Sequence, residues 1–306
     1  MKPLVAIVGP TASGKSQLAL RLAQRFGGEI VSADSRQVYR YMDIGTAKSS
    51  REEMSLVPHH LIDIINPDED FSLAQYQQLA YQKISEIQRR HKLPLLAGGT
   101  GQYLWAVVEG WVIPAVTPDI EFRQRLEGRA AQGEGDALYR ELAQIDPAAA
   151  QRIDRRNVRR VIRALEIAGR SDVSSVQPQS KVPPPFNTLL IGLTTERKEL
   201  YRRIDQRVDR MIELGLVDEV KGLLEKGYSL DLPSMSGIGY KQIGAFLKGE
   251  LTLAEATRQI KTETHRLVRR QYNWFRLKDE RIKWFDIQDN KTESEIEALV
   301  AGFVSK

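Results

Sequence analysis

The stretch LVAIVGPTASGKS, residues 4–16, joins an apolar run to a glycine-rich loop. Residues 9–16 fit the phosphate-binding pattern of Gly, four residues and then Gly-Lys-Ser or Gly-Lys-Thr. Such a loop wraps an anion with its backbone N–H groups, and the helix after it points its positive end at the same anion. The sequence therefore predicts a phosphate-binding loop at Gly9, Pro10, Thr11, Ala12, Ser13, Gly14, Lys15 and Ser16, with the Ser16 hydroxyl as a ligand for Mg²⁺.

Further apolar runs extend this beginning into a fold. Residues 3–9, 29–33, 93–98 and 188–194 read as buried strands, 282–287 as a possible last strand, and 16–26 as a helix. Strands that alternate with helices predict an α/β fold, here a P-loop core with a parallel sheet flanked by helices. Strand signals are missing from about 116 to 181. We therefore expect core segments at 1–115 and 186–306 and a helical insertion, or lid, at 116–185.

Composition narrows the class of protein. The 306 residues are 42% hydrophobic and 28% charged, as in ordinary soluble globular proteins. No apolar run is long enough to span a bilayer and no secretory signal opens the chain, so we expect a cytoplasmic protein without membrane contact. The sequence contains no cysteine, which excludes disulfides, zinc ribbons and thiol nucleophiles.

The net charge of +5 is concentrated in two segments. Residues 152–170 contain seven arginines, and RNVRRVIRALE predicts an amphipathic helix with Arg156, Arg159, Arg163 and Arg170 on one face. Arginine suits phosphate binding, although a solvated charged surface is the alternative. The second segment contains RRQYNWFR at 269–276, where cations alternate with aromatic residues. That pattern suits unstacked nucleic-acid bases, although the aromatic residues, Trp274 above all, could belong to the core.

Two polar segments follow predicted strands. SADSRQVY, residues 32–39, follows the second strand, and ligands of open α/β sheets bind beyond the carboxyl ends of strands. Asp34 should therefore face the phosphate loop, unless it only caps a helix. AGGTG, residues 97–101, places small residues and the Thr100 hydroxyl where a substrate could approach closely, unless this is a plain glycine turn. No Asn-Lys-x-Asp motif is present, which argues against a GTPase.

Seven blocks, in order, resemble the bacterial tRNA dimethylallyltransferases, the isopentenyl transferases that modify adenosine 37. They are GPTASGKS, SADSRQVYRYMDIGTAK, PHHLID, GGTGQYL, RNVRRVIRALE, GIGYKQ and IKTETHRLVRRQYNWFR. A phosphate loop alone would be a weak signal. Seven blocks spread over nearly the whole chain are highly specific.

The resemblance implies a reaction. The loop would hold dimethylallyl diphosphate with Mg²⁺, and N6 of adenosine 37 would attack C1 of the dimethylallyl group. The products would be N6-dimethylallyladenosine and diphosphate, in tRNAs that read codons beginning with U. Asp34 would accept the proton of N6, Thr100 would lie near the reacting atoms, and Arg207, in DQRVDRM, would stabilise the leaving diphosphate. A monomer is expected.

The resemblance also implies contacts with the tRNA anticodon stem-loop. Three blocks depart from the family's usual residues: Arg159 stands at a glutamine position, and Ser236 and Asn273 stand where Arg and Thr are frequent. The implied contact residues are Asp34, Ser35, Arg36, Gln37, Thr100, Arg123, Arg159, Arg160, Val161, Ile162, Arg163, Ser236, Gly237, Ile238, Gly239, Tyr240, Lys241, Arg269, Arg270, Gln271, Tyr272, Asn273, Trp274, Phe275 and Arg276.

Three other functions stay open at this point. A prenyltransferase that acts on free adenine nucleotides would keep the loop, Asp34 and the glycine-threonine turn, but it would not need two distant arginine-rich segments. A small-molecule kinase with a helical lid accounts for the arginine helix but not for the basic and aromatic block at 269–276. A non-catalytic RNA-binding switch would need nucleotide-sensing elements, which we do not find in the sequence.

Overall fold

The computed structural model describes residues 1–114, 119–169 and 181–305. The chain divides into two compact units. The first unit comprises Met1–Gly110 and Pro183–Lys306, and the second unit comprises Trp111–Val182. Arg170 and most of the proline- and serine-rich segment that precedes the fourth predicted strand lie outside the described residues.

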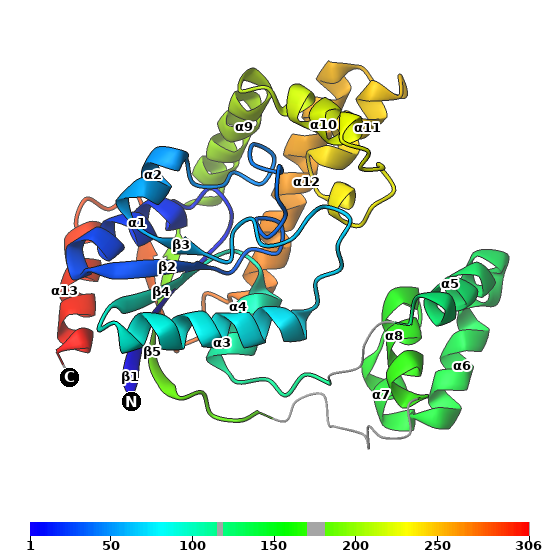
Figure 1. Ribbon diagram of the computed structural model, residues 1–306, viewed down its shortest axis with the longest axis horizontal. Helices are drawn as coiled ribbons and strands as arrows, with labels where there is room; N and C mark the ends of the chain where they lie inside the picture. The colour runs from blue at the N-terminus through cyan, green and yellow to red at the C-terminus, as the bar shows by residue number, and fades with distance from the viewer. Residues whose placement is uncertain (115–118, 170–180, 306) are drawn as a thin grey trace. The chain divides into compact units, whose positions relative to one another are not determined.

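The first unit is built on a six-stranded parallel sheet (Figure 1). The strand order is β3-β2-β4-β1-β5-β6. The five strands expected from the sequence are confirmed, as is the parallel α/β class. The sixth, β3, was missed because it is only two residues long. The strands are β1 (Lys2–Val8), β2 (Gly28–Ser32), β3 (His59–His60), β4 (Leu93–Ala97), β5 (Phe186–Thr194) and β6 (Ile282–Asp286).

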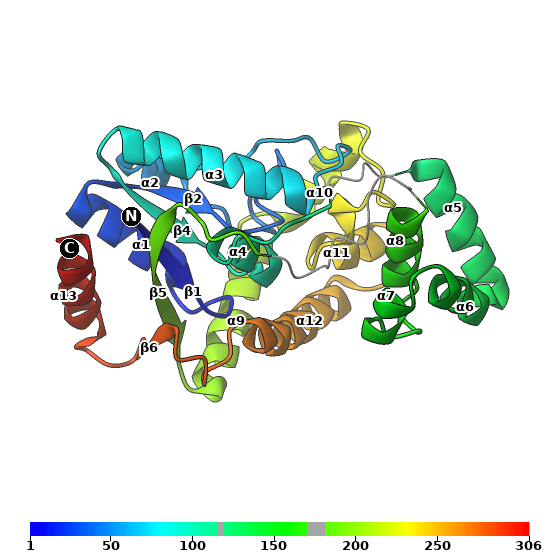
Figure 2. The same cartoon turned by 90° about the horizontal axis from the view of Figure 1, so that it is seen from below.

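Helices cover both faces of this sheet because alternate strand residues point to opposite faces. Val5 and Ile7 of β1 pack, with their neighbours on β4 and β5, against the buried sides of α1 (Lys15–Phe26) and α13 (Thr292–Val304). On β2 and β4, α3 (Leu73–Arg89) packs with α4 (Gly101–Val108) beside it, as Figure 2 shows. A short helix, α2 (Arg51–Leu56), leads into β3. The helix expected at 16–26 is thus α1, which begins one residue earlier.

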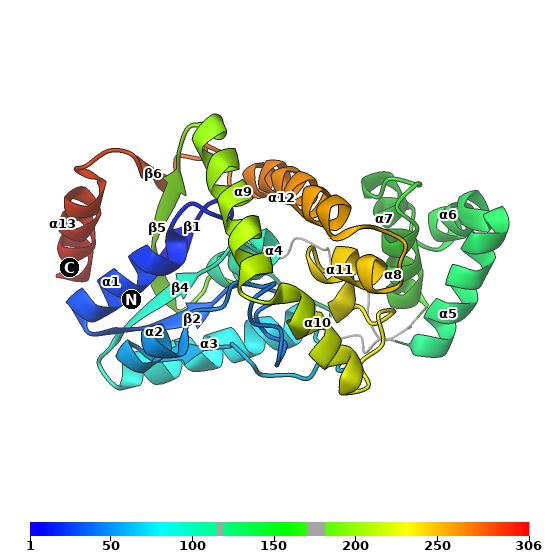
Figure 3. The ribbon, with the colours of Figure 1, turned by 90° about the horizontal axis from the view of Figure 1, so that it is seen from above.

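Four further helices pack around a core of their own (Figure 3). Leu200, Ile204 and Val208 on the first helix meet Ile260 and Val268 on the last, and all five are buried. This helical group follows β5, so it covers the polypeptide that leaves the carboxyl end of the sheet. The helices are α9 (Arg197–Glu213), α10 (Leu216–Glu225), α11 (Tyr240–Leu247) and α12 (Leu253–Trp274), with the 3-10 turn η2 (Ser234–Ser236) before α11.

The second unit is helical and has a separate core. Leu126, Leu138, Leu142, Val161 and Ile162 fill that core. Its helices are α5 (Ile120–Arg129), the π-helical turn η1 (Ala130–Glu134), α6 (Gly135–Ile145), α7 (Pro147–Arg152) and α8 (Val158–Ala168). Neither unit has, in the ranges that the structure describes, a helix with the length and apolarity needed to cross a bilayer.

The sheet brings three loops to one edge. β1 ends before the phosphate loop, β2 ends before Asp34, and β4 ends before Gly98. In a parallel sheet the carboxyl ends of all strands lie on the same side, and ligands bind there. This edge is therefore the place to look for an active site.

Candidate active site

The phosphate loop depends on glycine at its first position. Gly9 has a φ of 137°, and a Cβ added there would lie 2.3 Å from the carbonyl oxygen of Leu193. No other residue fits without moving β5, since L side chains rarely adopt this conformation. Gly14, with a φ of 80°, caps the start of α1. The loop expected at 9–16 therefore has the backbone geometry of an anion site at a helix N-terminus.

Lys15 points back into this loop. Its ammonium donates to the carbonyl oxygen of Pro10 at 2.5 Å. Burial and the positive charge of Arg207 lower the pKa of Lys15 to about 7, while the negative charge of Asp34 acts in the opposite direction. An ammonium held at such a low pKa gains much from a bound anion, because an anion stabilises its charged form.

Asp34 stands in a tight turn rather than at a helix cap. Its Oδ1 accepts the backbone N–H of Arg36 at 2.8 Å, and no helix begins before Arg51. The alternative that Asp34 caps a helix is therefore wrong. Within the described residues no hydrogen bond reaches Oδ2, although the side chain lines two neighbouring cavities. The turn thus fixes one carboxylate oxygen and leaves the other to face the site.

The glycines after β4 make room for other parts of the protein. A Cβ on Gly98 would lie 2.1 Å from the carbonyl oxygen of Ala33, and a Cβ on Gly99 would lie 2.4 Å from Nε2 of Gln271. The sequence interpretation, that small residues here only admit a substrate, misses this packing. The Thr100 hydroxyl accepts the backbone N–H of Ser35 at 3.0 Å and lies 3.2 Å from the Ser35 hydroxyl. Thr100 therefore holds the turn that carries Asp34.

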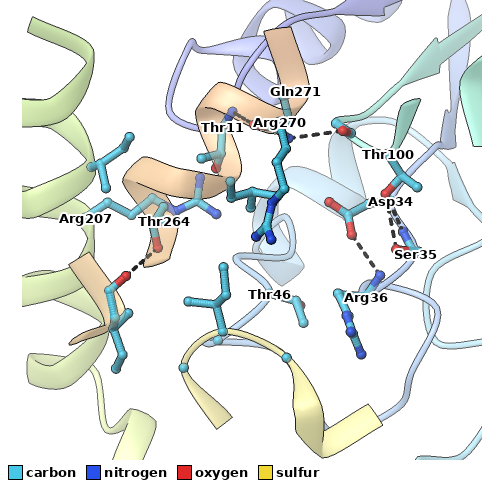
Figure 4. A pocket seen from close by; sticks show the side chains of 18 of the residues that line it. Thr11, Asp34, Ser35, Arg36, Thr46, Thr100, Arg207, Thr264, Arg270 and Gln271 are labelled. Carbon is cyan, nitrogen blue, oxygen red and sulfur yellow. Dashed lines mark hydrogen bonds between the residues drawn. The ribbon is translucent and has the colours of Figure 1, made fainter. Parts of the chain in front are cut away.

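Arg207 reaches the same site from α9. It lines three adjoining cavities, one with Lys15 and Ser16, one with Asp34 and Thr100, and a small one with all three of Lys15, Ser16 and Asp34. The described residues include no hydrogen-bond or ion-pair partner for its guanidinium, which burial makes costly to leave charged. Figure 4 shows Arg207 and Asp34 on opposite sides of the pocket. The structure thus brings together Lys15, Asp34 and Arg207.

The largest of these cavities has an apolar wall that the sequence analysis missed. It measures about 470 Å³ and is bounded on one side by Asp34, Thr100 and Arg207. The spacing of 204, 208 and 211 along α9 could have revealed the wall as one helix face, but it could not show that this face lines a cavity. The apolar side chains that line it are Ile204, Val208, Met211, Ile238, Ile260 and Leu267.

Glu219 was also missed. This side chain on α10 accepts the backbone N–H groups of Asp43 at 2.8 Å, Ile44 at 2.7 Å and Gly45 at 3.0 Å, and the Tyr240 hydroxyl at 2.6 Å. It thereby anchors the loop whose next residue, Thr46, lines the cavities with Asp34. No sequence signal points to such a role, because its partners are backbone groups of a distant segment.

The basic and aromatic block at 269–276 divides between core and surface. Phe275 is fully buried, and Gln271 is only 7% exposed. Trp274 is 37% exposed and lines the large cavity, so the expectation that Trp274 above all belongs to the core is wrong; Phe275 has that role. Tyr272 is partly buried, with its hydroxyl 2.8 Å from that of Thr194. The residues of the block that are exposed at the surface are Arg269, Arg270, Asn273, Trp274 and Arg276.

Residues 236–241 join the site through backbone and buried side chains. Gly237, Ile238 and Gly239 line the large cavity, whereas Tyr240 is buried and bonded to Glu219. Arg36 donates to the carbonyl oxygens of Pro233 at 3.0 Å and Ser234 at 3.2 Å, and its other terminal nitrogen lies 3.5 Å from the Ser236 hydroxyl. The Gln37 amide donates to the carbonyl oxygen of Ala47 at 3.3 Å. Lys241 is exposed.

The arginine helix of the second unit differs from its predicted form. Asn157 caps α8, so Arg156 precedes the helix and pairs with Asp154 instead of sharing its cationic face. Arg163 and Arg123 both pair with Glu166, whose side chain is 1% exposed. Val161 and Ile162 are core residues. Arg159 and Arg160 are exposed, and they are the members of the predicted block that present cations to solvent.

A metal cage of side chains is not present in the described ranges, where no three His, Cys, Asp or Glu residues gather. Ser16 nevertheless lines a cavity with Lys15 and Asp34 at the start of α1. Mg²⁺ commonly binds through substrate phosphates, one or two protein oxygens and water. This donor set fits a magnesium ion that arrives with a diphosphate, and it does not fit a tightly held resident metal.

Fold and site together define a P-loop α/β protein in which a carboxylate faces two cations across a cavity with an apolar wall. The sequence profile of the IPP transferase family matches residues 37–278, and this chain belongs to that family. The resemblance read from the seven sequence blocks is thereby confirmed.

Individual relatives agree over the whole chain. The tRNA dimethylallyltransferase of Dehalococcoides mccartyi is 49% identical over 305 residues, which cover 100% of this chain and 94% of that protein. The full-length tRNA isopentenylpyrophosphate transferase of Bacillus halodurans superposes with a TM-score of 0.74 at 45% identity and covers 100% of this chain and 97% of that one. A eukaryotic dimethylallyltransferase acting on tRNA has a TM-score of 0.84 at 28% identity, covering 100% and 80% respectively.

Proposed function

We propose that this protein transfers the dimethylallyl group of dimethylallyl diphosphate to N6 of adenosine 37 in the anticodon loop of tRNA. One observation carries the proposal: a P-loop lysine, a turn-held carboxylate and a buried arginine line adjoining cavities, the largest of which has an apolar wall. The names of the relatives favour tRNA as acceptor over free adenine nucleotides. They also disfavour the kinase and the RNA switch.

The charges suit departure of a diphosphate. Backbone N–H groups of residues 9–16 and the ammonium of Lys15 bind its oxygens, and Arg207 meets the charge that grows as the bond to carbon breaks. A kinase would direct attack at phosphorus. Here the attacked atom is C1 of the allyl group, and the diphosphate leaves whole. A bound Mg²⁺ would add positive charge to the leaving group, with Ser16 as its protein ligand.

The carboxylate suits the acceptor. N6 of adenine is a weak nucleophile because its lone pair is delocalised into the ring, and it must lose a proton as the new bond forms. The free oxygen of Asp34 accepts that proton. The base reaches the cavity by leaving the anticodon stack, as in other enzymes that modify nucleobases. The apolar wall from α9 and α12 accommodates the dimethylallyl chain and a face of the base.

The proposed acceptor is tested by incubating the protein with dimethylallyl diphosphate and Mg²⁺. Three acceptors are compared: unmodified tRNA, the same tRNA with guanosine at position 37, and AMP. Mass spectrometry of the digested nucleosides should find dimethylallyladenosine from the first tRNA alone. A prenylated AMP with unmodified tRNA would assign the protein to the nucleotide-modifying class instead.

Contact with the tRNA backbone should depend on salt. Each phosphate contact releases counterions, so replacing both Arg159 and Arg160 by Gln should flatten the plot of log Kd against log salt by up to roughly two units. Filter binding at several salt concentrations measures this. Arg202 and Arg210, two exposed arginines of α9 held by glutamates, provide a matched double replacement that should leave the slope unchanged. Equal slopes for both double variants would remove α8 from the tRNA interface.

Diphosphate binding should depend on pH through Lys15, whose pKa is lowered to about 7 by burial and by Arg207. A bound diphosphate favours the ammonium form and raises this pKa, so above pH 7 binding takes up a proton. Affinity for dimethylallyl diphosphate should therefore fall as pH rises from roughly 7 to 9, by at most about tenfold per unit. Lys15→Arg keeps its charge throughout this range and should flatten the profile. Calorimetry that finds the same slope for both proteins would refute the linkage.

A further inference from the structure

Gln271 connects the two loops between which the reaction takes place. It lies on α12, and its Oε1 accepts the backbone N–H of Thr11 in the phosphate loop at 2.8 Å. Its Nε2 donates to the carbonyl oxygen of Gly99, in the loop after β4, at 3.1 Å. Figure 4 shows Gln271 between Thr11 and the loop that carries Thr100. One buried amide thus satisfies backbone groups that follow two different strands.

The surroundings of Gln271 are shaped to this amide. A Cβ on Gly99 would lie 2.4 Å from Nε2, so this loop approaches only because it carries glycine there. The side chain is 7% exposed, which keeps it from a polynucleotide at the surface. The family resemblance groups Gln271 with tRNA contacts, but its neighbours Arg269 and Arg270 are the exposed residues of that helical turn.

The connection continues to the carboxylate. Gly99 precedes Thr100, and the Thr100 hydroxyl holds Ser35, the residue next to Asp34. A chain of hydrogen bonds and peptide units therefore runs from Thr11, through Gln271 and Thr100, to the turn of Asp34. Its two ends are the loop for the leaving group and the group that accepts the proton.

We propose that Gln271 is a positioning residue that sets the distance between the diphosphate loop and Asp34. This inference rests on the proposed prenyl transfer. In such a reaction the nucleophile, the allylic carbon and the leaving oxygen must lie in line. A displacement of about 1 Å costs on the order of 10²-fold in rate. Gln271 acts through the loops that it holds and does not touch the reacting atoms.

Gln271→Met removes both hydrogen bonds and keeps a buried side chain of similar length. The single-turnover rate at saturating dimethylallyl diphosphate should fall by roughly 10–100-fold. The Kd for tRNA should stay unchanged, since Arg269 and Arg270 remain in place. If Gln271 instead contacts tRNA, the Kd rises and the saturated rate is preserved. That result would overturn the proposal.

Gln271→Glu gives a signature that a merely structural role would not produce. A protonated carboxyl group can accept from Thr11 and donate to Gly99, as the amide does, whereas a carboxylate cannot donate. The ratio of the variant rate to the wild-type rate should therefore rise severalfold as pH is lowered from roughly 8 to 6. A ratio that does not change with pH, together with a normal rate for Gln271→Met, would refute the positioning role.

Tyr272→Phe is the matched control, because it removes a hydrogen bond between α12 and Thr194 without affecting either loop. It should retain the wild-type rate at every pH. If it matches Gln271→Met in rate, general loosening of α12 explains both variants and the proposal fails. Thermal denaturation of every variant identifies any that do not fold, and Gln271→Glu then decides alone. A wild-type protein that does not prenylate tRNA would refute the proposed function, a result distinct from all of these.

Discussion

Asp34→Asn should slow single-turnover prenylation of tRNA by about 10²–10⁴-fold, the usual contribution of a general base. The amide keeps the shape of the side chain, and its oxygen still accepts the N–H of Arg36, so the turn should survive. It cannot take a proton from N6. Affinity for dimethylallyl diphosphate should change little, because the diphosphate is bound by the phosphate loop and Lys15. Rapid-quench kinetics with enzyme in excess measures the chemical step.

Asp209→Asn is the control for loss of one negative charge, since Asp209 pairs with Lys261 on the surface of the helical group. It should prenylate at the wild-type rate. Asp34→Ala should be as slow as Asp34→Asn if the carboxylate is the base. A normal chemical step in Asp34→Asn would leave Asp34 with a role in placing adenine and no role in proton transfer.

Arg207→Gln should lower the same rate constant by about 10²–10³-fold, as expected when one preorganised donor to a developing charge is lost. Arg207 meets the leaving group from the side opposite to Asp34. Because no described residue pairs with its guanidinium, its charge is free to respond to the diphosphate. Glutamine keeps the polar character of the side chain and removes the charge. Measurements at saturating dimethylallyl diphosphate separate this effect from binding.

Arg210→Gln provides the comparison for Arg207→Gln. Arg210 lies nearly one turn further along α9, is paired with Glu213 and is exposed. Its replacement should leave the rate unaltered. If Arg207→Gln weakens diphosphate binding but keeps the saturated rate, Arg207 acts equally on the bound substrate and the transition state, and its assignment to the leaving group is wrong.

The convergence of the site could be predicted because a general rule of parallel sheets determines it. The phosphate loop and Asp34 each follow a buried strand, so their meeting needed only the strand assignments. The two-residue β3 escaped because a pair of histidines has no strand pattern. The role expected for Thr100 was incomplete for another reason. Its hydroxyl is held by Ser35, a partner that lies 65 positions away in sequence.

The roles of Gln271 and Glu219 lay beyond sequence reasoning. Both are polar residues on helices, and such residues usually face solvent. Each instead binds backbone groups of loops that are distant in the sequence, and backbone groups leave no residue-type signature. Burial of Phe275 rather than Trp274 is a related case. Adjacent aromatic residues on one helix differ in direction by about 100°, and only the packing of α12 decides which one enters the core.

The central claim is that this P-loop serves rupture of a carbon–oxygen bond and not transfer to or from phosphorus. It is tested most directly with dimethylallyl diphosphate that carries a heavy oxygen isotope in the bridge between C1 and the first phosphorus. After one turnover with tRNA, mass spectrometry should find all of the label in the released diphosphate and none in the prenylated adenosine. Label recovered in dimethylallyl alcohol, or orthophosphate in place of diphosphate, would mean attack at phosphorus and would contradict the mechanism.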